Sequence, residues 1–137
     1  MPEVEIVWTR GLQFVGTDST KHAVVLSSTD EQNGTGVKPS DLLLLALGGC
    51  TAVDVVAILR KKRQALTGLT VWVSAEQDVE PPWTFQRMHL VYEVSGKGLS
   101  ARAVEQAVTL SEEKYCSVRA TLVGRVEITH EVRLVEE

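Results

Sequence analysis

The feature that most constrains the fold is a run of uncharged residues from Leu42 to Val53, within the stretch 39–63. At 3.6 residues per turn, a helix over this run is apolar on every face, and such a helix is buried. The pair Gly48-Gly49 lies in the middle of the run, where each glycine costs roughly 0.8–1.0 kcal/mol relative to alanine. We therefore expect another backbone, or a ligand, to approach the helix at this pair.

The ends of the stretch carry helix signals. Pro39 suits the first helical position, and Asp41 in the first turn complements the positive end of the helix dipole. The basic run 60–63 does the same at the other end, and Gly68 follows as a stop signal. The sequence predicts one helix of about 25 residues over 39–63, roughly 38 Å long.

A membrane-spanning segment is the alternative interpretation of this stretch. Residues 42–59 contain a single charged residue, Asp54, and a basic run follows them. An acid inside a span is costly, and the flanking segments alternate like the strands of a soluble domain. We therefore favour a central core helix and expect no membrane partner.

Length and charge limit the class of protein. A chain of 137 residues, with 44% hydrophobic and 23% charged residues, fits one domain over 1–137. The net charge of -4 leaves no basic face large enough to neutralise several phosphates, so we expect no nucleic-acid partner. The segment after Met1 has an early acid and no apolar run, which indicates no secretory signal and a cytoplasmic location.

Alternating hydrophobicity predicts strands on both sides of the long helix, at 4–8, 12–15, 22–26, 69–79, 85–95 and 125–134. Because the strands come in runs and do not alternate strictly with helices, this order favours an α+β fold with antiparallel sheets around the long central helix. A helix apolar all round is hard to enclose in so short a chain. We therefore expect a homodimer.

A second helix is predicted to begin after Ser100, which has the character of an N-cap, and to stop near Cys116. It is amphipathic and peripheral. Its apolar side holds Val104, Ala107, Val108 and Ser111, and its exposed side holds Arg102, Glu105, Gln106, Glu112 and Glu113.

The sequence contains no recognisable motif for a metal or a nucleotide. The three histidines and two cysteines lack zinc-ligand spacing, and no nucleotide-binding glycine motif occurs, so we expect no metal and no cofactor. His22, His89 and His130 alternate within strands, which is typical of structural histidines. The cysteines remain as candidates for chemistry.

Cys50 has two interpretations. A free cysteine in an apolar helix is commonly a small buried hydrophobe. Against this, the neighbouring glycines clear space beside its sulfur, and Asp54 follows one turn later, where its carboxylate needs a cationic partner. A charge pair beside a thiol is how thiolates are poised. Cys116, flanked by Lys114 and Arg119 at the expected end of the second helix, is the candidate resolving cysteine.

Two blocks carry a resemblance to a known family. The sequences K-P-S-D-L-L-L-L-A-L-G-G-C-T-A-V-D-V-V at 38–56 and E-K-Y-C-S-V at 113–118 resemble the OsmC/Ohr family of thiol peroxidases. The opening W-T-R-G-L-Q-F-V-G and the closing V-E-I-T-H are similar to its YhfA-type branch. The resemblance implies an intertwined α+β homodimer with a site at the subunit interface. It also implies that Cys50 attacks a hydroperoxide and that Cys116 closes a disulfide.

One position departs from the family pattern. Organic hydroperoxide resistance proteins carry a glutamate at the position that Ser40 occupies here, paired with an arginine from the early strands. Asp41 stands next to Ser40, and Lys21 and His22 stand near the arginine position. Asp41, Lys21 and His22 are therefore supporting candidates for the site, as are Asp54 and Arg119.

The leading hypothesis is a thiol peroxidase that reduces organic hydroperoxides or hydrogen peroxide through a Cys50 sulfenate and a Cys50–Cys116 disulfide. The resemblance implies a dithiol reductant of the lipoyl type. Two alternatives remain open. One is a non-enzymatic protein that binds a small apolar ligand at the dimer groove, and the other is a thiol redox sensor.

Overall fold

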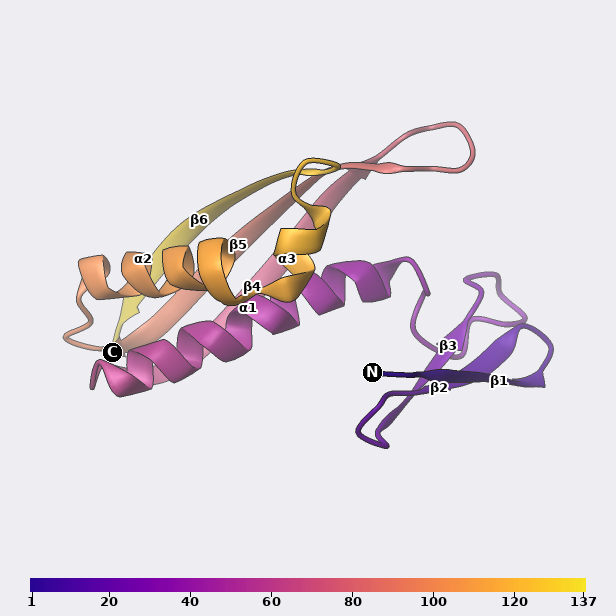
Figure 1. Cartoon of the computed structure of the whole chain (residues 1–137), viewed down its shortest axis with the longest axis horizontal. Coiled ribbons are helices and arrows are strands. Elements are labelled where there is room, and N and C mark those ends of the chain that lie inside the picture. Colours follow the sequence, from indigo (N-terminus) through magenta and orange to yellow (C-terminus); the bar gives the residue numbers. More distant parts are fainter. The chain divides into compact units, whose positions relative to one another are not determined.

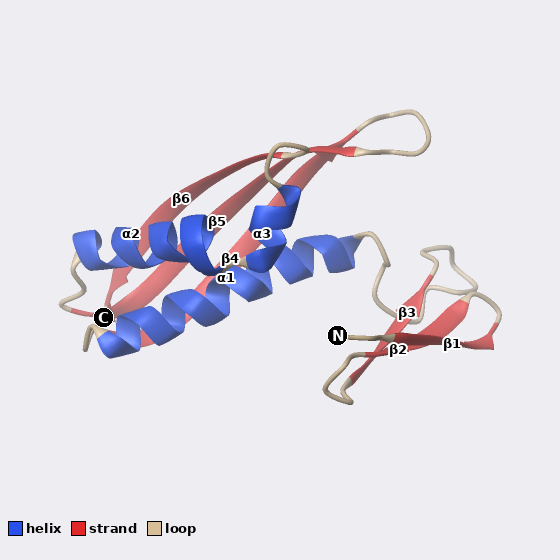
Figure 2. Ribbon diagram, in the orientation of Figure 1, coloured by secondary structure: helices blue, strands red, loops and turns tan.

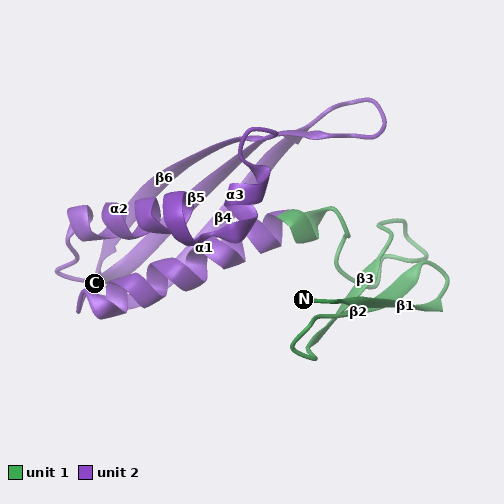
Figure 3. Cartoon of the chain, viewed as in Figure 1, with its two compact units in different colours: residues 1–43 green, residues 44–137 purple.

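The computed structural model describes residues 1–137, which form two compact units, residues 1–43 and 44–137 (Figure 3). Helix α1 (Asp41–Lys61) begins in the first unit and continues into the second. The expectation of one domain over 1–137 stays a prediction.

The first unit contains an antiparallel three-stranded sheet of β1 (Glu5–Arg10), β2 (Gln13–Thr17) and β3 (Ala23–Ser27), in that order (Figure 1). Gly11, with a φ of 51°, makes the tight turn between β1 and β2. The three strands predicted before the long helix are confirmed, with small shifts of their ends.

The second unit contains a sheet of β4 (Ala65–Gln77), β5 (Phe85–Lys97) and β6 (Glu127–Glu136), in that order. Strands β4 and β5 are antiparallel, as predicted, but β5 and β6 are parallel. The chain between them crosses the sheet as helices, so that β6 starts at the same end as β5. The α+β class is confirmed, and the direction of β6 differs from the expected antiparallel sheet.

The helices of the second unit lie along one face of this sheet (Figure 2). They are α1, α2 (Ala101–Leu110), a π-helical turn η1 (Ser111–Tyr115) and α3 (Ser117–Leu122). The predicted N-cap is confirmed, since the Ala103 backbone N–H donates to Ser100 Oγ at 3.1 Å. The core between helices and sheet consists of fully buried side chains, among them Leu47, Val55, Leu59, Leu90, Tyr92, Val94, Val104, Ala107 and Val108.

Helix α1 is shorter than the predicted 39–63 at both ends. Its C-terminal end lies before Arg63, which has a φ of 56°, and the expected stop signal Gly68 lies inside β4. One face of α1 is buried, but Leu45 and Val53 are 58% and 71% exposed. The expectation that every face is buried is therefore wrong for the single chain.

The glycine pair explains how α1 approaches the sheet. A Cβ atom on Gly48 would lie 2.8 Å from Cγ2 of Val73 on β4, whereas one on Gly49 would meet nothing within 4 Å. The chain's own sheet thus approaches Gly48 through valine side chains of β4, and it does not approach Gly49. By length and composition alone α1 could cross a membrane, but this packing makes it a core helix of the second unit.

Candidate active site

The second unit brings the two cysteines together. Cys50 lies on α1 and is partly exposed, whereas Cys116 lies between η1 and α3 and is 2% exposed. Both thiols are free, and they lie close enough for Cys50 to affect the pKa of Cys116. Residues 66 positions apart (116 minus 50) thus lie near each other. Their roles as site residues stay a prediction.

The buried Cys116 thiol holds its proton. Burial raises the pKa of its thiol to about 11, against hydrogen bonds from the backbone N–H groups of Arg119 and Val118, and the interaction with Cys50 adds to the rise. The expected location at a helix C-terminus is confirmed, because Cys116 is the C-cap of η1. Cys116 is also the N-cap of α3, where its Sγ accepts from the Arg119 N–H at 3.3 Å.

Asp54 lies one turn after Cys50 on α1, as predicted, but its partner is not a cation. The Ser111 hydroxyl donates to Asp54 Oδ2 at 2.8 Å, and no salt bridge reaches this carboxylate. The expected charge pair at Asp54 is therefore absent within the chain. The bond instead attaches η1 to α1.

A charged pair does lie beside the thiols, on the other side of Cys116. Glu112 is 5% exposed, and its Oε1 lies 3.5 Å from Arg119 Nε. The Tyr92 hydroxyl on β5 donates to Glu112 Oε2 at 2.8 Å, and His130 Nδ1 on β6 lies 3.1 Å from Oε1. Burial raises the pKa of Tyr92 well above its usual range, so the phenol stays a donor. Each oxygen of Glu112 has a partner, as a buried carboxylate requires.

Glu112 was expected on the exposed side of the second helix. The α-helix gives way at Ser111 to a π-helical turn, in which the Cys116 N–H donates to the Ser111 carbonyl, five residues back, at 2.8 Å. A π-helical turn holds more residues than an α-helical turn, so the side chains rotate relative to the α-helical pattern. Glu112 is buried beside Ser111 at the start of this turn. Its spacing of four and eight residues from Val108 and Val104 places it at the edge of the apolar side, so its charge and not its position assigned it to solvent.

The remaining candidates lie in the first unit. Lys21 has a φ of 72° in the turn before β3, and His22 Nδ1 lies 2.9 Å from Thr20 Oγ1. Asp41 is the exposed first residue of α1. The structure places these three residues in the first unit and the cysteines in the second.

The fold and the pair of cysteines on a buried helix and a neighbouring turn define a class of protein. Residues 31–131 match the family described as OsmC-like protein, and the chain belongs to this family.

The chain is 36% identical to Protein YhfA from Escherichia coli (strain K12) over 133 residues, which are 97% of this chain and 98% of that protein. A hypothetical protein from Aquifex aeolicus VF5 shares the fold with a TM-score of 0.83 and 29% identity, covering 98% of this chain and 97% of that one. The organic hydroperoxide resistance protein OhrB of Bacillus subtilis has the same fold at 16% identity. Its TM-score is 0.62, and the match covers 97% of this chain and 98% of that chain.

Proposed function

We propose that this protein is a thiol-dependent peroxidase that reduces organic hydroperoxides or hydrogen peroxide. The observation that carries the proposal is the contact between a partly exposed thiol, Cys50, and a buried one, Cys116. The organic hydroperoxide resistance named for the OhrB neighbour agrees with this chemistry.

Exposure assigns the two roles. A hydroperoxide must reach the attacking sulfur, and Cys50 is the more accessible thiol. In the first step the Cys50 thiolate attacks the terminal peroxide oxygen; an S–O bond forms, the O–O bond breaks, and the alkoxide leaves as an alcohol after it takes up a proton. Cys50 is then a sulfenic acid.

In the second step Cys116 attacks the Cys50 sulfur. An S–S bond forms, the S–O bond breaks, and the departing hydroxide becomes water with the proton that Cys116 gives up. The interaction between the two thiols supports a second sulfur that lies beside the first before any oxidation. The disulfide therefore closes without a large rearrangement of the chain.

The enzyme is proposed to act as a homodimer. Leu45 and Val53 on α1 are large apolar side chains that are 58% and 71% exposed, which is costly in a monomer in water. A second copy over this face of α1 would cover them and narrow the access to Cys50. The resemblance to the family implied such an interface.

A small dithiol of the lipoyl type is the proposed reductant. Ala46 and Val53 are exposed apolar neighbours of Cys50 on α1, so a charged tripeptide such as glutathione loses more hydration there than an aliphatic dithiol does. A dithiol also leaves the mixed disulfide by ring closure. Turnover with dihydrolipoamide should exceed turnover with glutathione at equal thiolate concentration.

The test of the function is a count of free thiols after one equivalent of cumene hydroperoxide. A peroxidase loses two thiols per chain within seconds. Slow loss coupled to a change of oligomeric state would instead indicate a redox sensor, and no loss would indicate a protein that binds a ligand without chemistry.

A further inference from the structure

Arg119 connects the buried carboxylate to the second sulfur. Its backbone N–H donates to Cys116 Sγ at 3.3 Å, and its guanidinium Nη1 donates to the Glu112 carbonyl at 2.9 Å. The Nε atom is fully buried and faces Glu112 Oε1 at 3.5 Å, without a hydrogen-bond partner. A single residue therefore fixes both the sulfur and the turn that precedes it.

Glu112 in turn is fixed to the sheet. Its carboxylate contacts Tyr92 on β5 and His130 on β6, and these rigid strands set where the π-helical turn lies. Without this anchor, η1 is a single turn with irregular hydrogen bonding, a kind of segment that has alternative arrangements. The contacts thus run without a break from the sheet through Glu112 and Arg119 to Cys116.

We propose that Glu112, Arg119 and His130 are positioning residues for disulfide closure, which hold Cys116 in line with Cys50. The inference rests on the Cys50–Cys116 disulfide of the proposed function, and it needs no peroxide. Attack on sulfur requires the incoming thiolate to lie close to the axis of the bond that breaks. A displacement of about 1 Å in such a step costs on the order of 100-fold in rate.

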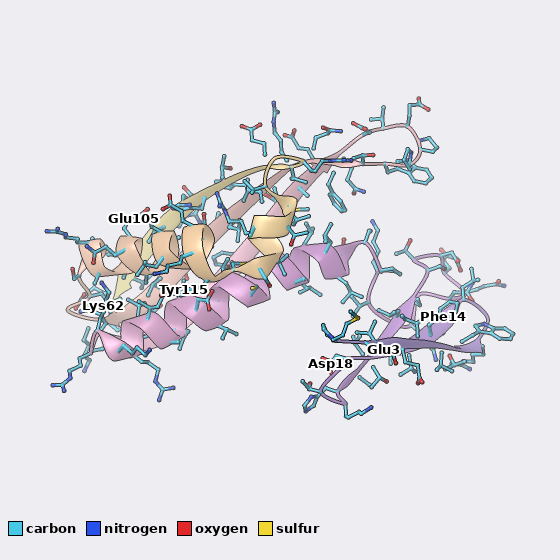
Figure 4. The ribbon with its side chains drawn as sticks, in the orientation of Figure 1. Glu3, Phe14, Asp18, Lys62, Glu105 and Tyr115 are labelled. Atoms are coloured by element: carbon cyan, nitrogen blue, oxygen red, sulfur yellow. The ribbon has the colours of Figure 1, made fainter.

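His130 makes this anchor sensitive to pH. Its Nδ1 lies 3.1 Å from Glu112 on η1, and its Nε2 lies 3.0 Å from Glu105 on α2, which projects from that helix in Figure 4. Tyr92 packs edge-on against the ring, and Arg119 on α3 faces Glu112 from the other side. A neutral imidazole donates through one nitrogen only, whereas the imidazolium donates through both. Loss of the proton therefore removes one of the two bonds.

Closure can be measured without peroxide. One equivalent of the aromatic disulfide dithiobis(nitrobenzoate) labels the partly exposed Cys50 of the full-length reduced protein. The Cys50 thiolate bonds to one thionitrobenzoate, the S–S bond of the reagent breaks, and the other thionitrobenzoate leaves as a first coloured thiolate, which reports labelling. The second release reports closure. The Cys116 thiolate then attacks the Cys50 sulfur; the intramolecular disulfide forms, thionitrobenzoate leaves as a coloured thiolate, and the Cys116 proton passes to buffer. In Cys116→Ser the label stays in place, which assigns the signal.

The variants separate positioning from folding. Glu112→Gln and Arg119→Gln should slow thionitrobenzoate release about ten- to a hundred-fold, with the rate of Cys50 labelling unchanged. Arg119→Lys keeps the charge but loses the planar fork, so we expect native thermal stability with a slowed release. The matched control is Arg87→Gln, because Arg87 pairs with Glu76 and Glu127 on the exposed surface. This variant should close at the wild-type rate.

The pH dependence of thionitrobenzoate release tests His130 separately. The ratio of wild-type to variant rates would not depend on pH if His130 only stabilised the fold. The ratio of wild-type to His130→Gln release rates should be largest in acid and fall as the pH rises, because only the imidazolium makes both bonds. A constant ratio would remove His130 from the proposal.

Release within two-fold of wild type in both Glu112→Gln and Arg119→Gln would overturn the proposal. The proposal would also be overturned if Arg119→Gln slowed Cys50 labelling and thionitrobenzoate release equally while Arg119→Lys had both rates at the wild-type value. That result would indicate a structural role. A wild-type protein that closes its disulfide here but consumes no hydroperoxide would contradict the proposed function and leave the positioning role intact. A wild-type protein that never releases the label would remove the positioning role.

Discussion

The Ser111 hydroxyl donates to Asp54 Oδ2 at 2.8 Å, which joins the first residue of η1 to α1 one turn after Cys50. The chain segments that carry the two cysteines are therefore attached to each other at a point beside the thiols. The attachment uses a partly buried carboxylate, which gives it more weight than a bond on the surface.

A double-mutant cycle measures this attachment. Ser111→Ala leaves the Asp54 carboxylate partly buried without its donor, so we expect a loss of about 1.5–3 kcal/mol in the free energy of unfolding. Asp54→Ala should cost less once Ser111 is already alanine, with a coupling of about 1 kcal/mol between the two changes. Urea unfolding of the four proteins gives the coupling. Strictly additive losses would show that the bond contributes nothing in solution.

Substitutions at Gly48 and Gly49 should change the stability of the protein in opposite directions. Gly48→Val forces a side chain against Val73, where the Cβ alone would lie 2.8 Å from Cγ2, and we expect a loss of roughly 1–3 kcal/mol. Gly49→Ala meets open space and should gain up to about 1 kcal/mol from helix propensity. Thermal unfolding of the two variants checks this pair. Equal effects would show that α1 does not pack on β4 through Gly48.

The predicted homodimer can be tested at its exposed apolar face. Light scattering at micromolar concentration should report a dimer for the wild type, and Val53→Glu should shift it to monomer by burying a charge in the contact. Val79→Glu is the matched control, because Val79 is 90% exposed in the turn between β4 and β5. A monomeric wild-type protein in this measurement would contradict the predicted homodimer.

Serine variants of the two cysteines should stop the proposed reaction at different steps. Cys50→Ser should abolish hydroperoxide consumption, because it removes the attacking sulfur. Cys116→Ser should undergo one fast oxidation and then stall as a sulfenic acid, which excess peroxide oxidises further. Stopped-flow consumption and intact mass together distinguish the two. Equal losses in the first turnover would show that the assigned roles are wrong.

Stability should fall in alkali because of Cys116. Its pKa is about 11 in the folded protein against an ordinary value of 9.0, so between these values the folded chain holds a proton that the unfolded chain has released. The contribution is fully present below the ordinary value and is lost as the pH rises through the folded one. The melting temperature of the reduced protein should therefore fall over this range, and less steeply in Cys116→Ala. Identical slopes would contradict the raised pKa.

The sequence predicted the features that depend on local patterns. Alternation located the strands, Ser100 marked the start of α2, and the family blocks singled out Cys50 and Cys116, whose thiols lie near each other. Features that depend on long-range packing were missed. The direction of β6 follows from where the crossing helices return the chain, and no residue of β6 encodes this.

The burial of α1 also depends on packing that the sequence pattern does not show. Composition alone predicted a helix enclosed on every face, yet the chain covers only the face with Leu47, Val55 and Leu59. The buried Glu112 was assigned to solvent because of its charge, although it follows Val104 and Val108 at helical spacing. Neither the π-helical turn nor the partners Tyr92 and His130 leave a periodic signal.

The π-helical turn has a consequence for how this site can change over generations. Deleting one codon between those for Leu110 and Cys116 would let α2 continue with ordinary i to i+4 bonding and rotate the adjoining residues by about 100°. Glu112 would keep its place beside α2, whereas Cys116 and Arg119 would rotate relative to it, so that Arg119 would lose its carboxylate. A sequence of this lineage that is one residue shorter there would keep both cysteines and the overall architecture but lose the charged support beneath the second thiol. The length of this short segment would then distinguish relatives that keep Arg119 paired with Glu112 from those that do not, although both would hold the same two cysteines.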